Sequence, residues 1–160
     1  MKPAARIEFF TRLQELNPHP PPAPLLWGNP AVLAAVLLSA QATDVGVNKV
    51  TRKLFPVADK PGAMIDLGLK KIKKAVSSLG LYNAKAANVL ATCQLLVERH
   101  GSQVPRQREA LEALPGVGRK TANVVLNTAF GEPVMAVDTH IFRVSNRTGL
   151  AKGKTVRQVE

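Results

Sequence analysis

Apolar residues recur every three or four positions along most of this chain, which is the spacing of one face of a helix. The first such stretch, 4–16, carries Ile7, Phe10 and Leu13 and ends where Asn17-Pro18 interrupts the pattern. No convincing alternation of apolar and polar residues, the signature of a half-buried strand, is found in the sequence. The pattern therefore predicts an all-α fold.

The stretch 31–41 is apolar on nearly every side and predicts a buried central helix. Asn29 can cap this helix, and Pro30 suits its first position. The proline-rich segment 18–24 that precedes it can be neither a helix nor a central strand. We therefore expect an extended connector there, and with it a boundary between two parts of the chain.

Further helices follow along the chain. We expect them from Thr43 or Asp44 to just before Pro56, over 63–67 and 69–79 on either side of Gly68, and over 83–100 with Gly101 as the C-cap. Lys85 and the lysines of 70–74 are expected on solvated faces. Asp138 and Thr155 are candidate caps of two later helices. Because a single turn after Thr155 is unstable alone, we expect this helix to continue past Glu160.

A glycine turn separates two helical stretches within 108–130. Its sequence is Leu114-Pro115-Gly116-Val117-Gly118, in which the proline cannot continue the first helix and the glycines permit a tight turn and the close approach of another molecule. The first backbone N–H groups of the following helix lack intrahelical partners, so the turn is suited to hold an anion such as a phosphate. Lys120 lies two residues past the last glycine, within reach of a group held there.

The charge of the chain favours a polyanionic partner. Its 160 residues include 22 Lys and Arg against 11 Asp and Glu, a formal net charge of +11. Because no uninterrupted apolar run is long enough to span a bilayer, nucleic acid is favoured over a membrane. The lone cysteine, Cys93, excludes an internal disulfide, and its apolar neighbours predict that it is buried. We expect a cytoplasmic protein.

The hairpin and the segments around it resemble a known family. The hairpin continues as Gly118-Arg119-Lys120-Thr121-Ala122 and is followed by Val134-Met135-Ala136-Val137-Asp138-Thr139-His140. Together with Leu37-Leu38-Ser39-Ala40-Gln41-Ala42-Thr43-Asp44 and Leu79-Gly80-Leu81-Tyr82-Asn83-Ala84-Lys85, these motifs resemble the endonuclease III family of helix-hairpin-helix DNA glycosylases. The resemblance extends from Ile7 to Glu160. It implies a monomeric bacterial repair enzyme at the nucleoid, which removes oxidised pyrimidines from double-stranded DNA and cleaves abasic sites.

The resemblance also implies an architecture. A six-helix barrel would cover 22–133, with the helix-hairpin-helix at about 108–130, and a second lobe would combine 1–21 with 134–160. In the family this second lobe continues and binds a four-iron four-sulfur cluster through four cysteines. Those cysteines are absent here, and Cys93 cannot replace them because a cluster needs several converging thiolates. We therefore expect an incomplete second lobe, and no metal ligand or cofactor in this chain.

The resemblance assigns Lys120 as the nucleophile and Asp138 as its paired carboxylate. An amine must be unprotonated to attack the anomeric carbon, and the positive start of a helix beside Arg119 disfavours the ammonium form. A carboxylate can stabilise positive charge that develops on the sugar and can handle protons. Spacing alone leaves two plainer interpretations open, a lysine that contacts a phosphate and an aspartate that caps a helix.

Chemistry at the anomeric carbon requires the damaged nucleotide to leave the duplex, so side chains must fill the gap. The resemblance implies Gln41 and Leu81 as these fillers; a helix cap at Gln41 and a hydrophobic helix-end contact at Leu81 are the plainer alternatives. Other DNA contacts are expected from Leu114, Gly116, Val117, Gly118, Arg119 and His140. For His140 a structural role is the alternative.

Two other functions stay open from the sequence. One is a non-catalytic helix-hairpin-helix fragment that binds DNA through phosphate contacts. The other is a monofunctional adenine glycosylase, against which Lys120 argues because that branch lacks the nucleophilic lysine. The sequence also leaves open which lesions are preferred.

Overall fold

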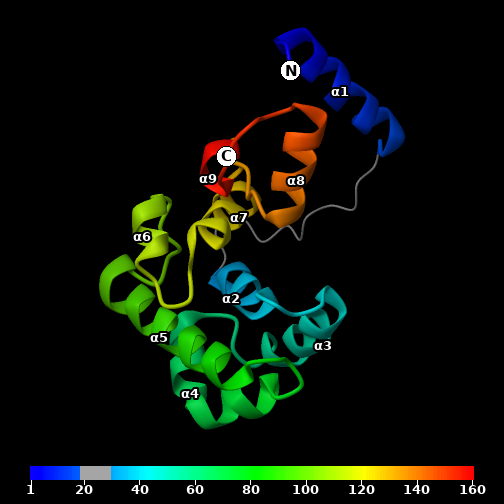
Figure 1. Ribbon diagram of the computed structural model, residues 1–160. Coiled ribbons are helices and arrows are strands. Elements are labelled where there is room, and N and C mark those ends of the chain that lie inside the picture. Colours follow the sequence, from blue (N-terminus) through cyan, green and yellow to red (C-terminus); the bar gives the residue numbers. More distant parts are fainter. Residues whose placement is uncertain (19–29) are drawn as a thin grey trace. The chain divides into compact units, whose positions relative to one another are not determined.

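The computed structural model describes residues 1–18 and 30–160 (Figure 1). In these two ranges the chain forms nine helices and no strand, which confirms the predicted all-α class. The helices are α1 (Pro3–Leu16), α2 (Pro30–Ser39), α3 (Asp44–Leu54), α4 (Pro61–Val76), α5 (Tyr82–His100), α6 (Arg108–Glu112), α7 (Arg119–Phe130), α8 (Thr139–Thr148) and α9 (Val156–Val159). None of these described helices combines the length and the apolar character that a membrane crossing requires.

The chain divides into two compact units. Unit 1 comprises Met1–Leu25 and Met135–Glu160, and unit 2 comprises Leu26–Val134. Unit 1 therefore contains α1, α8 and α9, and unit 2 contains α2 to α7. The expected cap at Asn29, the barrel boundary at residue 22 and most of the predicted connector 18–24 lie outside the described residues.

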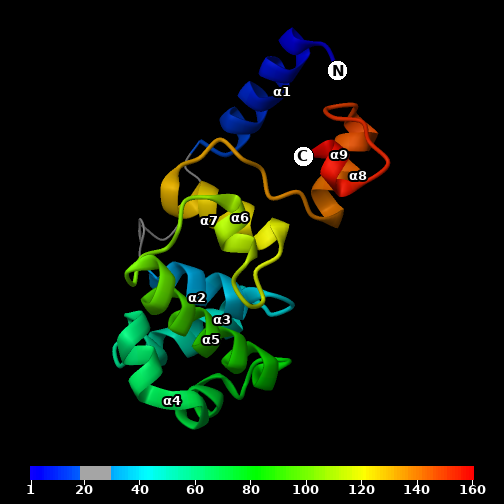
Figure 2. The same cartoon turned by 90° about the vertical axis from the view of Figure 1, so that its left-hand side faces the viewer.

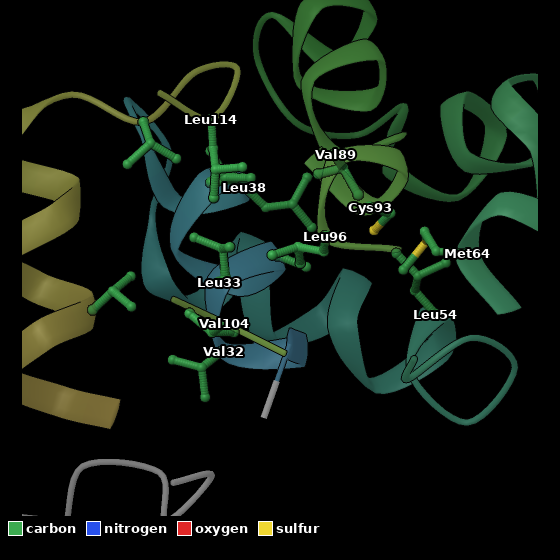
Figure 3. Packing of buried hydrophobic residues seen from close by; sticks show 14 of the residues in the cluster. Val32, Leu33, Leu38, Leu54, Met64, Val89, Cys93, Leu96, Val104 and Leu114 are labelled. Atoms are coloured by element: carbon green, nitrogen blue, oxygen red, sulfur yellow. The ribbon is translucent and has the colours of Figure 1, made fainter. Parts of the chain in front are cut away.

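Helix α2 is the centre of unit 2, as its sequence predicts. Leu33 and Leu38 are 1% and 0% exposed, and α2 contacts α3, α5 and α7. Figures 1 and 2 show it between α7 on one side and α5 on the other, and Figure 3 shows Leu33 and Leu38 among the buried side chains of their neighbours. The helix ends at Ser39, two residues before the predicted end, because Gln41 has a left-handed backbone with φ 53°.

The helix ends in unit 2 follow local signals in the sequence. Thr43 caps α3 by accepting a hydrogen bond from the Gly46 N–H, and Gly101 ends α5 in a left-handed conformation. Gly68 interrupts α4 with φ 77° and ψ 158°, so this element consists of two helical pieces joined at a kink, as predicted. The second piece ends at Val76, three residues before the predicted end. Cys93 lies in the core at 6% exposure, which confirms its predicted burial.

Contacts with α5 and α7 hold the short helix α6 and the hairpin in place. The Arg108 guanidinium donates a hydrogen bond from Nε to Oδ1 of Asn123, which is 0% exposed on α7, at 2.9 Å. The Thr92 hydroxyl of α5 donates to the Pro115 carbonyl at 3.2 Å. Five residues of helix are unstable alone, so α6 depends on this packing.

Unit 1 is built around α8. Asp138 caps this helix, and Thr155 caps α9 in a capping box with Gln158, as the sequence predicts for both residues. The amino group of Met1 donates a hydrogen bond to the Gly149 carbonyl at the end of α8. Helix α1 forms where predicted, but it has no buried residue, and Ile7 and Leu16 are 71% and 81% exposed.

Candidate active site

The hairpin 113–118 presents backbone rather than large side chains at the start of α7. Leu114 and Val117 are 3% and 6% exposed, so their side chains belong to the core and only their backbone can meet a ligand. Gly118 is the N-cap of α7, and no side chain caps the helix there. The Ala122 N–H donates to the Gly118 carbonyl at 2.9 Å. A helix start without a capping side chain is suited to bind an anion.

The two hairpin glycines are needed for different reasons. Gly116 has φ 78°, and a Cβ at this position would lie 2.5 Å from Nδ2 and 3.2 Å from Cβ of Asn88. Gly118 has φ −93° and ψ 175°, which any residue can adopt, and a Cβ there would meet no atom within 4 Å. Gly116 is thus required by the fold, whereas Gly118 leaves open space in front of the helix start.

Lys120 lines a cavity together with the predicted filler Gln41. The cavity has a volume of about 340 Å³. Its lining residues come from the end of α2, the turn after it and the first two turns of α7: Val36, Ser39, Ala40, Gln41, Lys120, Thr121 and Val124. Unit 2 therefore places two exposed residues, Lys120 and Gln41, on one hollow beside the hairpin. Ser39 and Thr121 are not among the predicted site residues; Ser39 lies two residues before Gln41, and Thr121 directly follows Lys120.

Both predicted filler positions have a strained backbone. Among the described residues, the non-glycine residues with positive φ are Gln41 at 53°, Leu81 at 56° and Ser102 at 64°. A left-handed conformation is uncommon outside glycine, and such strain often marks functional positions. Leu81 is also 64% exposed although it is a large apolar side chain. The sequence gives no sign of the strain at Leu81, because the adjacent Gly80 would adopt a left-handed conformation more easily.

Arg119 forms an ion pair within unit 2. Its Nη1 lies 3.9 Å from Oε1 of Glu112 on α6, and both side chains are about one third exposed. An ion pair this exposed contributes little to stability. The Arg119 side chain therefore lies beside the hairpin with about one third of its surface exposed to water.

The predicted residues Asp138 and His140 belong to unit 1. Oδ1 of Asp138 accepts hydrogen bonds from the N–H groups of His140 at 3.0 Å and Ile141 at 2.9 Å, so the carboxylate caps α8. This is the plainer of the two interpretations from the sequence, and it is compatible with a chemical role. His140 is exposed on the first turn of α8.

Lys85 contradicts the expectation of a solvated face. It is 5% exposed, and its Nζ is buried without a hydrogen-bond partner among the described residues. It lies on the same face of α5 as Thr92, whose hydroxyl bonds the hairpin. Burial lowers the pKa of this lysine. The expectation was wrong because it considered the charge without the packing of α5; the lysines 70, 71 and 74, by contrast, are exposed as expected.

The residues of this chain do not fit a metal cluster. The part of the chain that the structure describes has no group of three or more His, Cys, Asp or Glu side chains that could hold a metal ion. A four-iron four-sulfur cluster needs several converging thiolates, and the sequence has one cysteine. Burial raises the pKa of the Cys93 thiol to about 11, so it is a poor source of thiolate.

Comparison with known proteins identifies the family. Residues 34–160 match the HhH-GPD superfamily of base excision DNA repair proteins. Endonuclease III of Escherichia coli (strain K12) is 61% identical to this chain over 161 residues, covering 100% of this chain and 76% of the relative. The chain belongs to the endonuclease III family. This places it in base excision DNA repair, among the DNA glycosylases and abasic-site lyases.

Two solved structures from the endonuclease III family share the fold of the whole chain. One is a trapped endonuclease III–DNA covalent intermediate, and the other is a non-covalent endonuclease III–DNA complex. Each has a TM-score of 0.86 and 42% sequence identity, and each comparison covers 100% of this chain and 76% of the solved chain. Both of these structures of endonuclease III are complexes with DNA.

Proposed function

We propose that this chain removes oxidised pyrimidines from double-stranded DNA and cleaves the resulting abasic site, with Lys120 as the nucleophile. The observation that carries the proposal is the placement of Lys120. It lies on the cavity shared with Gln41, two residues past a helix start that no side chain caps. A phosphate bound at the hairpin would bring the neighbouring sugar toward this amine.

The reaction proceeds through a covalent intermediate. The unprotonated Nζ of Lys120 attacks the anomeric carbon, and the bond to the damaged base breaks, with the base taking the bonding electrons. One of the two protons on the nitrogen passes to the ring oxygen as the bond between that oxygen and the anomeric carbon breaks. The sugar ring opens, and a protonated Schiff base, an iminium, remains at that carbon. The iminium acidifies the adjacent carbon; removal of a proton there expels the 3′-phosphate by β-elimination.

Asp138 supplies the carboxylate in this proposal. A carboxylate can stabilise positive charge that develops on the sugar and can accept or deliver protons. Its Oδ1 is held by two backbone N–H groups of α8, which fixes the direction in which the carboxylate faces. The structure describes Asp138 within unit 1 and Lys120 within unit 2, so their pairing is part of the proposal.

Contacts with DNA come from the residues around the hairpin and from the two strained turns. The backbone of Leu114, Gly116, Val117 and Gly118 would hold a phosphate, with Arg119 and His140 as further polar contacts. Gln41 and Leu81 would fill the gap left by the extruded nucleotide. The similarity to the two endonuclease III–DNA complexes supports double-stranded DNA as the partner. On chromosomal DNA the protein would act as a monomer at the nucleoid in the cytoplasm.

Borohydride trapping tests the proposal. Reduction of the Schiff base should give a stable protein–DNA adduct on a duplex that contains an oxidised pyrimidine. We expect Lys120→Gln to abolish the adduct and to retain most of the DNA affinity, because the hairpin is unchanged. Lys60→Gln, which removes an exposed lysine at the start of α4, is the control and should trap normally.

Two outcomes would identify the alternatives. Base release without any adduct by the unaltered protein would indicate a monofunctional glycosylase. DNA binding with neither base release nor adduct would indicate a non-catalytic helix-hairpin-helix module. An adduct that persists in Lys120→Gln would show that another amine is the nucleophile.

A further inference from the structure

A basic groove lies between α3 and α4 in unit 2. It is a hollow of about 480 Å³, and none of the residues that line it lines the cavity of Lys120. Its lining residues are Lys49, Val50, Lys53, Lys71, Lys74, Ala75, Ser77 and Ser78. A second, adjoining hollow on α3 shares Lys49 and Lys53 and adds Arg52. We use the name basic groove for the first of these two hollows.

No acidic side chain among the described residues neutralises the four lysines of the basic groove. Lys49 and Lys53 are one turn apart on α3, and Lys71 and Lys74 are one turn apart on α4. Like charges at this spacing destabilise a helix. Throughout the described ranges none of the four ammonium groups has a hydrogen-bond or ion-pair partner, and none of the described lining residues is acidic. The basic groove therefore presents four positive charges to solvent that an anionic ligand can neutralise.

The basic groove is continuous with the turn that carries Leu81. Ser77 and Ser78, which line the basic groove, follow the last residue of α4 and are followed along the chain by Leu79 and Gly80. The start of α3 reaches the same turn, because a Cβ added to Gly46 would lie 3.5 Å from Cδ2 of Leu79. A DNA strand that passes Leu81 would therefore reach the basic groove next.

We propose that the basic groove binds the phosphodiester backbone of DNA beyond the opened nucleotide. Ammonium groups on both walls can neutralise successive phosphates, and the Ser78 hydroxyl can donate a hydrogen bond to one of them. The Ser77 hydroxyl already donates to the Lys74 carbonyl at 2.9 Å. One small anion would meet only part of the two rows, whereas a polymer of phosphates can meet both. This inference rests on the proposed function only for the choice of DNA as the ligand.

The salt dependence of DNA affinity tests this inference. The variants are Lys49→Gln/Lys53→Gln on α3 and Lys71→Gln/Lys74→Gln on α4. The control, Lys60→Gln/Arg99→Gln, removes the same charge at exposed positions outside the groove. Binding is measured between about 50 and 200 mM salt, on a lesion duplex that extends about 10 base pairs to each side. Circular dichroism establishes that each variant is folded.

We expect each groove variant to reduce the slope of log affinity against log salt by about 1 to 2, because each lost phosphate contact removes about 0.9. The affinity should fall about tenfold at the lower salt concentration, and the control should keep the slope of the unaltered protein. At saturating DNA the rate of borohydride trapping should not change, since Lys120 and its cavity are untouched.

Equal slopes for the groove variants and the control would overturn the inference. The same holds if the groove variants lose affinity for polyglutamate but not for DNA, because the occupant would then be an acidic polypeptide. A failure of the proposed catalytic function can be distinguished from a failure of the basic-groove inference. If the unaltered protein gives no adduct but the groove variants still lower the slope, the basic groove binds DNA and the catalytic proposal is wrong.

Discussion

At the scale of single residues, Lys85 places an amine inside unit 2 at a cost in stability. A buried donor without a partner costs about 1–3 kcal/mol, and more when it is charged. Its stem lies on the face of α5 that packs toward the hairpin. The residue was misjudged from the sequence because a lysine near a helix start usually faces water.

We expect Lys85→Met to raise the free energy of unfolding at pH 7 by about 1–3 kcal/mol, since the side chain keeps its length and loses the unpartnered donor. Burial lowers the pKa of Lys85, so between that pKa and the ordinary lysine value the unfolded chain binds more protons. The stability of the unaltered protein should therefore rise with pH across this window relative to Lys85→Met. Urea unfolding at neutral and alkaline pH measures both effects.

Burial raises the pKa of Cys93 to about 11, so this residue destabilises the fold as the pH rises above the ordinary thiol pKa. The effect is the same in the unaltered protein and in Lys85→Met, and it cancels when the two are compared at each pH. Lys70→Met, at an exposed position of α4, is the control and should leave stability nearly unchanged. A less stable Lys85→Met protein at pH 7 would contradict the interpretation.

Leu81 combines an exposed apolar side chain with a left-handed backbone. Leu81→Ala and Leu81→Gly both remove the side chain, but only glycine relieves the backbone strain. We expect the glycine variant to be more stable than the alanine variant by roughly 1 kcal/mol, as measured by urea unfolding. Both should excise a lesion from duplex DNA poorly and a lesion in single-stranded DNA nearly normally. Normal excision from the duplex by either variant would remove Leu81 from the filler role.

At the scale of elements, the hairpin between α6 and α7 is shaped by packing and left open toward solvent. The Thr92 hydroxyl and the Asn88 side chain of α5 lie against Pro115 and Gly116, while Gly118 faces open space. The turn is therefore rigid on its inner side and accessible at the start of α7. This combination is what a backbone anion site requires.

We expect Gly116→Ala to destabilise the protein by about 2 kcal/mol, because alanine is strained at positive φ and its Cβ would collide with Asn88. Gly118→Ala should stay within about 0.5 kcal/mol of the unaltered protein, because its conformation and surroundings accept a Cβ. Thermal unfolding separates the two.

The Gly118→Ala variant also tests the anion site. We expect its DNA affinity to fall about tenfold, or about 1.4 kcal/mol, because the methyl group would occupy the space of the phosphate. Unchanged affinity in this stable variant would place the phosphate elsewhere. A stable Gly116→Ala protein would instead show that Asn88 can move away.

At the scale of the whole molecule, part of the excess positive charge is concentrated in one groove, which the composition cannot show. The formal charge of +11 favours nucleic acid, and four of the lysines line one groove on unit 2. Lys71 and Lys74 are exposed, as their helical spacing predicts. Their position opposite Lys49 and Lys53 follows only from the packing of α3 against α4.

The helical class, most helix ends and the family are predictable from the amino-acid sequence alone. Caps at Thr43, Asp138 and Thr155, the kink at Gly68 and the end at Gly101 act through neighbouring backbone groups, so they are legible within a few residues. Candidate site residues were named through motifs that resemble those of the family.

Which distant residues meet depends on how the helices pack in three dimensions. Lys120 and Gln41 share a cavity because α7 packs against α2, and Lys85 loses water because α5 packs into the core. The left-handed conformations of Gln41 and Leu81 are also imposed by their surroundings, since neither residue favours them. Burial, strain and shared cavities depend on contacts between segments far apart in the chain, and no local pattern encodes those contacts.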